Sequence, residues 1–244
     1  GAPRSGTTLL TQLLISQYEI GYVSNLIARF WKAPYLGLLL AKEIRDPDRP
    51  PDVGFSSSRG FTSGYEGPHE FGYFWRRWFD YQESHSVRAE AIDADTINGL
   101  RRECAAMQSI EESPFLFKNL VCSFQVEFLA RTFPQSVFVH CRRNPLYVAQ
   151  SLLRCREQYC ENLEAWFSVK PEAYPELKEL PYPDQIAGQI YHTRRHVEGA
   201  FQQLSENRYC RLEYEAIVDS PIASLQYIVE VIEQVGGTLV KRKN

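Results

Sequence analysis

The sequence predicts an α/β protein with a central parallel sheet flanked by helices, and two observations carry this prediction. Short β-rich runs alternate with helical patterns along the chain, which is typical of parallel sheets covered by helices. Two turns that contain proline and arginine come directly before predicted helices, at the positions where such sheets place their binding loops. The chain has 244 residues and no evident linker, so we expect one domain over residues 1–244.

Local patterns justify each element in turn. A helix is predicted from Thr7 after the turn Gly1–Gly6, and because such a turn usually follows a buried strand, we expect the sequence to be trimmed at its start. Further strands are predicted at 115–117, 136–141 and 209–212, and helices at 124–132, 145–159, 185–204 and from 221 onward. The buried face of the last helix is expected to hold Ile222, Leu225, Val229 and Ile232. The proline-rich stretch 170–184 is expected to be an ordered surface loop.

Composition and charge argue against several function classes. The hydrophobic share of 44% indicates a globular chain, and the net charge of −3 gives no overall attraction to nucleic acid or an anionic membrane. The apolar run Tyr35–Ala41 is far shorter than the about 20 residues of a membrane span, and no signal peptide is readable. The six cysteines lack a zinc-type spacing, so buried free thiols and a cytoplasmic location are expected. A Cys155–Cys160 bridge is the alternative for a secretory protein.

The turn Gly1–Gly6 is the first candidate binding site. Its glycines have the spacing of a P-loop, but Thr7 stands where a P-loop has lysine, and the positive charge lies at Arg4. Backbone N–H groups in such a turn, and the positive end of the helix that follows, favour a bound phosphate. The hydroxyls of Ser5 and Thr8 are expected to donate hydrogen bonds to its oxygens. The alternative is a glycine-rich turn without a ligand.

A second half-site follows the strand that ends at Cys141. Arg143 lies at the end of this strand, Pro145 suits the first turn of the next helix, and Ser151 comes eight residues after Arg143. Because ligands bind at the carboxyl ends of parallel strands, we expect both half-sites at the same edge of the sheet. Without a ligand, these residues would be a surface arginine and a helical serine.

The segment Ala2–Leu10 (APRSGTTLL), together with Arg143-Asn144-Pro145 and Ser151, resembles the sulfotransferases that use 3′-phosphoadenosine-5′-phosphosulfate (PAPS). The similarity runs from Gly1 to about Gly237 and implies a P-loop NTPase-like fold. It implies that the 5′-phosphosulfate is bound by Arg4, Ser5, Gly6, Thr7 and Thr8. It also implies a 3′-phosphate site at Arg143 and Ser151, with Tyr214 near the nucleotide.

The chain departs from that family in two places. Many cytosolic members end a central strand with Lys-Thr-His and use the histidine as base, whereas this chain has Lys118-Asn119-Leu120. A late basic loop of the family has no clear counterpart, although Lys241-Arg242-Lys243 lies near the right place. A solvated basic tail is the alternative interpretation of that segment.

Sulfuryl transfer needs charge stabilisation at the leaving oxygen and a base for the acceptor proton, and Arg4 and Lys118 are candidates for the first task. The segment around Pro68-His69-Glu70-Phe71 resembles the P-x-E-F stretch of bacterial carbohydrate sulfotransferases, which implies Glu70 as the base. His69 is the adjacent alternative, and a base elsewhere is a third. The aromatic residues that follow Glu70 either desolvate its carboxylate or pack into the core around a solvent-facing one.

The remaining features receive structural interpretations. His192 and His196 have a helical spacing that suits a metal, but no acidic partner lies between them, so no metal is expected; His85 and His140 are also expected to be structural.

Competing functions are a P-loop nucleotide kinase or NTPase and a nucleotide-binding module without catalysis. The acceptor is expected to be a small molecule or a glycan, recognised by residues 71–81 and 170–184.

Overall fold

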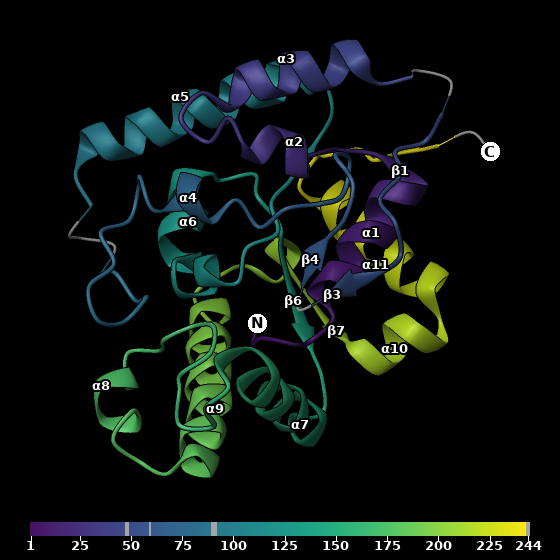
Figure 1. The fold of residues 1–244 in the computed structure, drawn as a ribbon. Coiled ribbons are helices and arrows are strands. Elements are labelled where there is room, and N and C mark those ends of the chain that lie inside the picture. Colours follow the sequence, from purple (N-terminus) through teal and green to yellow (C-terminus); the bar gives the residue numbers. More distant parts are fainter. Residues whose placement is uncertain (47–48, 59, 89–91, 243–244) are drawn as a thin grey trace.

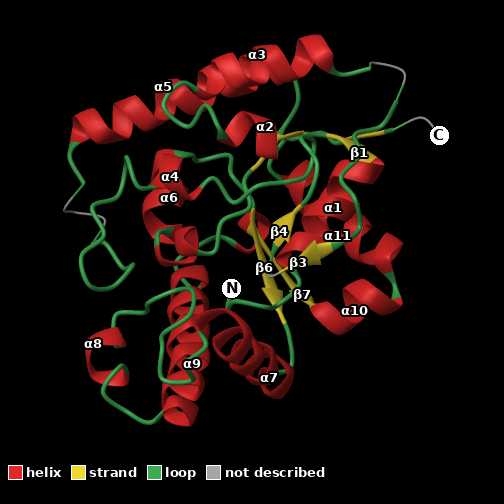
Figure 2. Ribbon diagram, viewed as in Figure 1, coloured by secondary structure: helices red, strands yellow, loops and turns green. Residues whose placement is uncertain are grey.

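The structure is a computed structural model that describes residues 1–46, 49–58, 60–88 and 92–242. Helices cover both faces of short parallel strand pairs, which confirms the predicted α/β fold (Figures 1 and 2). Its α-helices are α1 (Thr7–Gln17), α2 (Asn25–Ala28), α3 (Pro34–Ile44), α4 (Gly72–Trp75), α5 (Ala94–Glu111), α6 (Val126–Thr132), α7 (Pro145–Cys155), α8 (Tyr174–Leu177), α9 (Tyr182–Phe201), α10 (Tyr214–Asp219) and α11 (Pro221–Gln234).

The strands are short and pair two by two in the described part of the chain. They are β1 (Tyr18–Glu19), β2 (Gly21–Tyr22), β3 (Ser57–Ser58), β4 (Phe61–Thr62), β5 (Phe115–Leu116), β6 (Phe138–Arg142), β7 (Tyr209–Glu213) and β8 (Val240–Lys241). The pairs β2–β5 and β6–β7 are parallel, whereas β1–β8 and the hairpin β3–β4 are antiparallel. Short 3₁₀ helices occur at η2 (Val121–Phe124) and η4 (Glu206–Arg208), and a π-helical turn occurs at η3 (Arg156–Cys160).

The pair β6–β7 is the best-formed part of the sheet and positions the second half-site. Five residue pairs align from Phe138 with Tyr209 to Arg142 with Glu213. Side chains alternate along β6: Val139 and Cys141 join a core with α1 and α11, whereas His140 packs against Phe201 of α9. This alternation buries both faces of the pair, as expected for a parallel sheet between helices.

A second core joins α2, α3, α4, α5 and α6, and Phe138 of β6 packs against it. Its buried members include Phe71, Phe74 and Trp75, which follow Glu70 within five residues, and Phe128 of α6. The rings of Phe71 and Phe74 stack with centroids 4.5 Å apart. These aromatic residues therefore pack into the core, which is the second of the two interpretations open from the sequence.

Two predicted elements need correction. In α11, Ile222 is 72% exposed, because the buried stripe runs through Leu225, Ile228 and Val231 and leaves Val229 and Ile232 at its margin. The stretch 170–184 is not only a loop, since it contains α8 and the first turn of α9. Helix α9 begins at Tyr182 rather than Gln185, because Pro183 is well placed in a first helical turn.

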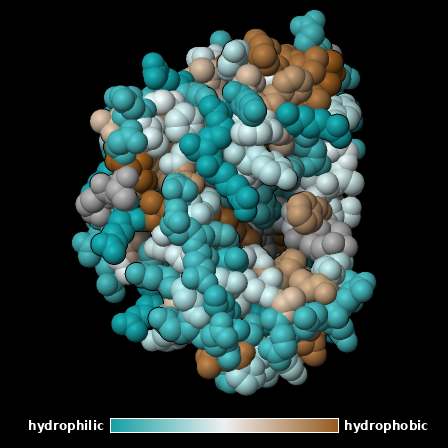
Figure 3. Space-filling model, turned by 60° about the vertical axis from the view of Figure 1, so that its left-hand side comes forward, coloured by the Kyte–Doolittle hydropathy of each residue, from teal (hydrophilic) through white to brown (hydrophobic). Residues whose placement is uncertain are grey.

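One face of α3 carries apolar side chains on the surface. Tyr35, Leu36, Leu39, Leu40 and Ile44 are each between 41% and 50% exposed. Figure 3 shows apolar surface at the top of the molecule, where Figure 1 places α3. Among the helices of the described residues, none combines the length and apolar character needed to cross a bilayer.

Candidate functional site

The turn before α1 adopts the backbone that its glycines predict. Arg4 and Gly6 both have left-handed conformations, with φ angles of 65° and 92°. A methyl group on Gly6 would overlap the ring of Tyr214, so glycine is required here for both its backbone angle and its lack of a side chain. The turn and Tyr214, more than 200 residues apart in sequence, are thus in direct contact.

Of the two hydroxyl groups predicted to bind phosphate, that of Ser5 differs from the prediction. Ser5 is 1% exposed, and its Oγ donates a hydrogen bond to the Ala2 carbonyl oxygen at 2.6 Å. The Ser5 hydroxyl therefore stabilises the turn itself, and its proton is not free for a phosphate. Thr8 is also buried, and its Oγ1 faces the segment around Gly60 that is described below.

The two half-sites meet, as their placement at strand ends predicts. Arg4 Nε donates to Ser151 Oγ at 2.9 Å, and Arg143 Nη1 donates to the Arg4 carbonyl oxygen at 3.2 Å. The Arg143 guanidinium lies 4.4 Å from the centroid of the Tyr214 ring. Arg4, Ser151, Arg143 and Tyr214 thus form one connected cluster.

Arg143 has a donor group that the protein does not satisfy. Its Nε is buried and has no hydrogen-bond partner among the described residues. A buried unpartnered donor costs free energy unless a ligand or water completes it, and a charged one suits an anion. This donor therefore fits a bound phosphate group.

Lys118 and Glu70, the candidate cation and the candidate base, also lie next to each other. Together they form the transfer centre. Lys118 Nζ lies 2.7 Å from Glu70 Oε1 and donates a second hydrogen bond to the Gly60 carbonyl oxygen at 3.2 Å. The Lys118 side chain is 5% exposed, whereas that of Glu70 is 36% exposed. The pair thus has a buried cation and a carboxylate that solvent, or an acceptor, can reach.

Gly60, in the turn directly before strand β4, shows how the predicted phosphate site and the transfer centre are related. A methyl group on Gly60 would lie 3.7 Å from Glu70 Oε1, 3.7 Å from Thr8 Oγ1 and 3.8 Å from Lys118 Nζ. Each of these three atoms therefore lies within 4 Å of one point. A hydroxyl from the first turn of α1, the lysine and the candidate base are thus close together.

His69 lies beside Glu70, but its imidazole is engaged elsewhere. Its Nδ1 accepts a hydrogen bond from the Phe71 backbone N–H at 2.9 Å. Burial lowers the pKa of His69 below its usual value, and of the two nearby charges Glu70 opposes this shift while Lys118 adds to it. A neutral imidazole that accepts at Nδ1 carries its proton on Nε2, so neither nitrogen has a free lone pair for an acceptor proton.

Three residues that support the site were not singled out from the sequence. Asn119 Nδ2 donates to the Glu70 carbonyl oxygen at 2.7 Å, and its Oδ1 accepts from the Cys122 N–H at 3.0 Å. Arg194 of α9 donates to the Arg143 carbonyl oxygen. Gly60 is the third. Asn119 is adjacent to Lys118 and Gly60 lies in a glycine-rich run, whereas Arg194 carries no sequence signal because helical arginines are common.

The basic tail does not lie at the phosphate turn. Arg242 donates to carbonyl oxygens of Ile15 and Gln17, near the C-terminal end of α1, whereas the turn precedes the N-terminal end of that helix. Lys241 pairs with Tyr18 in the β1–β8 ladder, and Lys243 lies outside the described residues. In the described part of the chain, no group of three or more His, Cys, Asp or Glu side chains is placed to hold a metal ion.

Comparisons with known proteins identify the family and the fold of the chain. Residues 1–234 match a family described as the sulfotransferase family, so the chain belongs to that family. A search of the curated proteins found no match. The crystal structure of sulfotransferase STF9 from Mycobacterium avium is similar, with a TM-score of 0.58 and 16% sequence identity over 96% of this chain. This similarity confirms the P-loop-like sulfotransferase fold, and this chain spans 62% of the STF9 chain.

Proposed function

We propose that this member of the sulfotransferase family transfers a sulfuryl group from PAPS to a hydroxyl or amine of an acceptor. The acceptor class is a carbohydrate, a lipid or another small metabolite. The observation that carries the proposal is the convergence of Thr8 Oγ1, Lys118 Nζ and Glu70 Oε1 around one point. Sulfuryl transfer requires a phosphate-binding group, a cation and a base together, and these atoms supply all three.

The nucleotide would be held by both half-sites. In the turn, the backbone of Arg4, Ser5, Gly6 and Thr7 and the Thr8 hydroxyl would bind the 5′-phosphosulfate, supported by the N-terminal end of α1. The unpartnered Arg143 Nε, with Ser151, would bind the 3′-phosphate, and Tyr214 would lie beside the nucleotide. Because Arg4 Nε bonds Ser151, we assign the Arg4 guanidinium to this half of the site.

The bound donor supplies a sulfuryl group whose bond from sulfur to the bridging oxygen breaks as the acceptor oxygen or nitrogen bonds to sulfur. Lys118 would stabilise the negative charge that stays on the bridging oxygen, and its burial strengthens this interaction. Glu70 would take the acceptor proton, since its carboxylate is partly exposed beside Lys118. The tautomer inferred for His69 favours Glu70 over His69 as the base.

The competing functions are less well supported. A nucleotide kinase of the P-loop type needs a lysine in the turn, and Thr7 occupies that position. A binding module without catalysis would not need a buried lysine paired with a carboxylate next to the turn. The cytoplasmic location stays a proposal that rests on the cysteine content, since six cysteines in a chain of this length do not make a disulfide scaffold.

The proposal is tested by calorimetric titration of the chain with adenosine 3′,5′-bisphosphate and, separately, with ATP and magnesium. We expect the bisphosphate to bind and ATP with magnesium to bind at least about tenfold more weakly, because the Arg143 half-site recognises a 3′-phosphate that ATP lacks. Tighter binding of ATP would support the kinase. Bisphosphate binding without turnover of PAPS across carbohydrate, lipid and phenol acceptors would support the binding module.

A further inference from the structure

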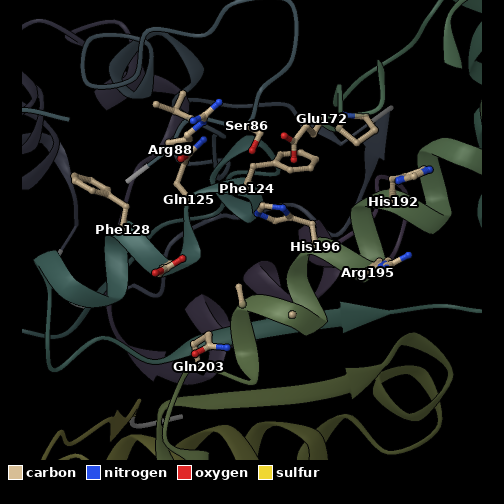
Figure 4. A pocket seen from close by; sticks show the side chains of 15 residues that line it. Ser86, Arg88, Phe124, Gln125, Phe128, Glu172, His192, Arg195, His196 and Gln203 are labelled. Carbon is tan, nitrogen blue, oxygen red and sulfur yellow. The ribbon is translucent and has the colours of Figure 1, made fainter. Parts of the chain in front are cut away.

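Two surface features lie outside the phosphate turn and the transfer centre. Figure 4 shows a cavity of about 520 Å³ along α6 and α9, and its wall includes Pro171 and Glu172. These two residues belong to the stretch 170–184, so the cavity falls within the region already expected to bind the acceptor. The other feature is the apolar face of α3, which consists of the exposed side chains of Tyr35, Leu36, Leu39, Leu40 and Ile44. The proposed function does not use this face.

The α3 face is continuous along its helix. Its members recur at intervals of three and four residues, which places them on neighbouring positions of one helix surface. The opposite side of α3 is also apolar, and its Leu38 and Ala41 are buried in the core that joins α2 and α5. A helix that is apolar all round is normally buried all round. In α3, the described residues of the chain cover only one of the two sides.

The size of the α3 face indicates what kind of contact could cover it. Five half-exposed side chains of this size present roughly 400 Å² of apolar surface, which is the scale of patches that mark interaction sites. A stable protein–protein interface buries about 800 Å² of each partner. The face together with its polar rim therefore suits a reversible contact between two folded proteins.

The two ends of the α3 face carry opposite charges. Lys32 lies just before the N-terminal end of α3, Glu43 lies in its last turn, and both are exposed. Lys32 Nζ lies 5.0 Å from the centroid of the Trp31 ring, and neither Lys32 nor Glu43 forms an ion pair with another described residue. A cation at the N-terminal end and an anion at the C-terminal end both oppose the dipole of the helix. Each charge would therefore be stabilised by an opposite charge from a partner.

The cations at the C-terminal end of α3 are turned towards α5. Lys42 Nζ donates to the Ile110 carbonyl oxygen at 3.0 Å, and Arg45 Nη1 lies 3.9 Å from Glu111 Oε2. Glu43 comes four residues after Leu39, so it lies on the same side of the helix as the apolar face. At this end, the α3 face thus presents a negative charge.

We propose that the α3 face binds the α3 face of a second copy of this chain, with the two helices antiparallel. A two-fold axis between the copies brings the N-terminal end of each helix beside the C-terminal end of the other, so Lys32 of each copy pairs with Glu43 of the other. A parallel arrangement would instead bring like charges together. A membrane surface suits the face less well, because it would draw the Glu43 carboxylate towards lipid along with the apolar side chains.

Sedimentation equilibrium of the whole chain over about 1–200 µM tests the proposal, and we expect a monomer–dimer equilibrium with a Kd of about 1–100 µM. Leu39→Glu should weaken the dimer by at least about tenfold, because it buries a carboxylate in the apolar contact. Ile222→Glu is the matched control. Ile222 is 72% exposed on α11, so the same change of an exposed apolar residue should alter Kd by less than about twofold.

An exchange of charges tests the antiparallel arrangement. Lys32→Glu and Glu43→Lys should each weaken the dimer by about three- to tenfold, because each substitution places like charges opposite each other at two symmetric positions. The double variant Lys32→Glu/Glu43→Lys restores opposite charges, so its Kd should lie within about twofold of that of the parent.

Three results would overturn the proposal: a chain that stays monomeric at about 200 µM, a dimer that Leu39→Glu does not weaken, or a double variant that dimerises no better than the single ones. A monomeric chain that sediments with phosphatidylserine vesicles, and no longer does so as Leu39→Glu, would assign the face to a membrane instead. Thermal unfolding checks that Leu39→Glu folds; if it does not, the charge variants decide, since both residues are exposed. Because the readout is self-association, the outcome does not depend on sulfuryl transfer.

Discussion

The phosphate turn and the transfer centre lie side by side but are held in place in different ways. The turn is fixed by contacts from several directions: Ser5 bonds Ala2, Arg4 bonds Ser151, Arg143 bonds the Arg4 carbonyl, and the Tyr214 ring packs on Gly6. At the transfer centre, the Lys118–Glu70 ion pair and the hydrogen bond from Asn119 to the Glu70 carbonyl oxygen join two segments. Lys118 also bonds the carbonyl oxygen of Gly60, next to the hairpin β3–β4.

This difference separates binding from chemistry. Changes in the turn affect many contacts at once, so they should alter stability and nucleotide affinity together. Changes at the Lys118–Glu70 pair remove few structural contacts, so they should alter turnover while the fold and nucleotide affinity persist. Glu70→Gln, Arg143→Ala and Gly6→Ala break or sharpen this contrast, and His85→Gln tests a residue outside both regions.

Glu70→Gln should have the largest effect. If Glu70 takes the acceptor proton, the amide keeps the shape of the side chain but lowers kcat by about 10² to 10⁴. Affinity for adenosine 3′,5′-bisphosphate should stay within a few fold, because no contact of the turn involves Glu70. Steady-state kinetics and calorimetry measure the two quantities.

His69→Asn is the matched control for this variant. Since His69 Nδ1 accepts from the Phe71 N–H, its loss should disturb the local backbone and reduce kcat by much less than Glu70→Gln does. Near-parental turnover in Glu70→Gln, with none in His69→Asn, would show that the histidine is the base.

Arg143→Ala should weaken the binding of adenosine 3′,5′-bisphosphate far more than that of adenosine 5′-monophosphate. A charge-assisted contact with phosphate is worth roughly 1.5–3 kcal/mol, so the ratio of the two affinities should fall by about ten- to a hundredfold. Any loss of order in the turn after Arg143 is removed should weaken both ligands equally, so it does not change the ratio of their affinities. Equal losses for both ligands would exclude Arg143 from the 3′-phosphate site.

Gly6→Ala tests how rigidly the turn is packed. Its φ of 92° and the Tyr214 ring leave no room for a methyl group, so the free energy of unfolding should fall by about 1–3 kcal/mol and nucleotide affinity should fall with it. Gly72→Ala, beside the transfer centre, meets no atom within 4 Å and should change stability by less than about 0.5 kcal/mol. Denaturant unfolding measures the free energy of unfolding of both variants. Equal losses would contradict the difference in rigidity between the phosphate turn and the transfer centre.

The smallest expected effect is on the pH dependence of stability. It involves His85, which lies outside both the phosphate turn and the transfer centre. Burial, with the nearby charges of Lys170 and Arg76, lowers the pKa of His85 from 6.5 to about 4. Between pH 6.5 and 4 the unfolded chain binds a proton that the folded chain does not, so stability falls as the pH falls through this window. His85→Gln should reduce this loss by roughly 1–2 kcal/mol after allowance for solvent screening. If the free energy of unfolding varied with pH in the same way in the parent and in His85→Gln, the prediction would be contradicted. His192→Gln is the control.

Much of the fold and the site was predictable because it rests on local chemistry. Glycine spacing indicates the turn before α1, and the β-rich run Ser136–Cys141 indicates β6. Since parallel strands end at one edge of a sheet, the clustering of the turn with Arg143 followed from topology alone. The roles of these residues in catalysis stay predictions.

What escaped prediction depends on contacts between distant segments. The exposure of Ile222 is set by how α11 packs, and helical periodicity defines a face only to within about one residue. The Ser5 hydroxyl bonds within its own turn, a local choice that residue type alone does not decide. Gly60 and Arg194 reach the site from a hairpin and from α9, so only the folded chain identifies them.

The internal bonding of the phosphate turn has a consequence for the thermodynamics of binding. Arg4 has a left-handed backbone that costs conformational energy in most residues, and the hydrogen bonds of Ser5 and Arg143 hold it there without a ligand. The entropy of ordering this segment is therefore lost during folding. Under the proposed function, little of the binding free energy of the nucleotide would then be spent on rearrangement, because the turn is preorganised.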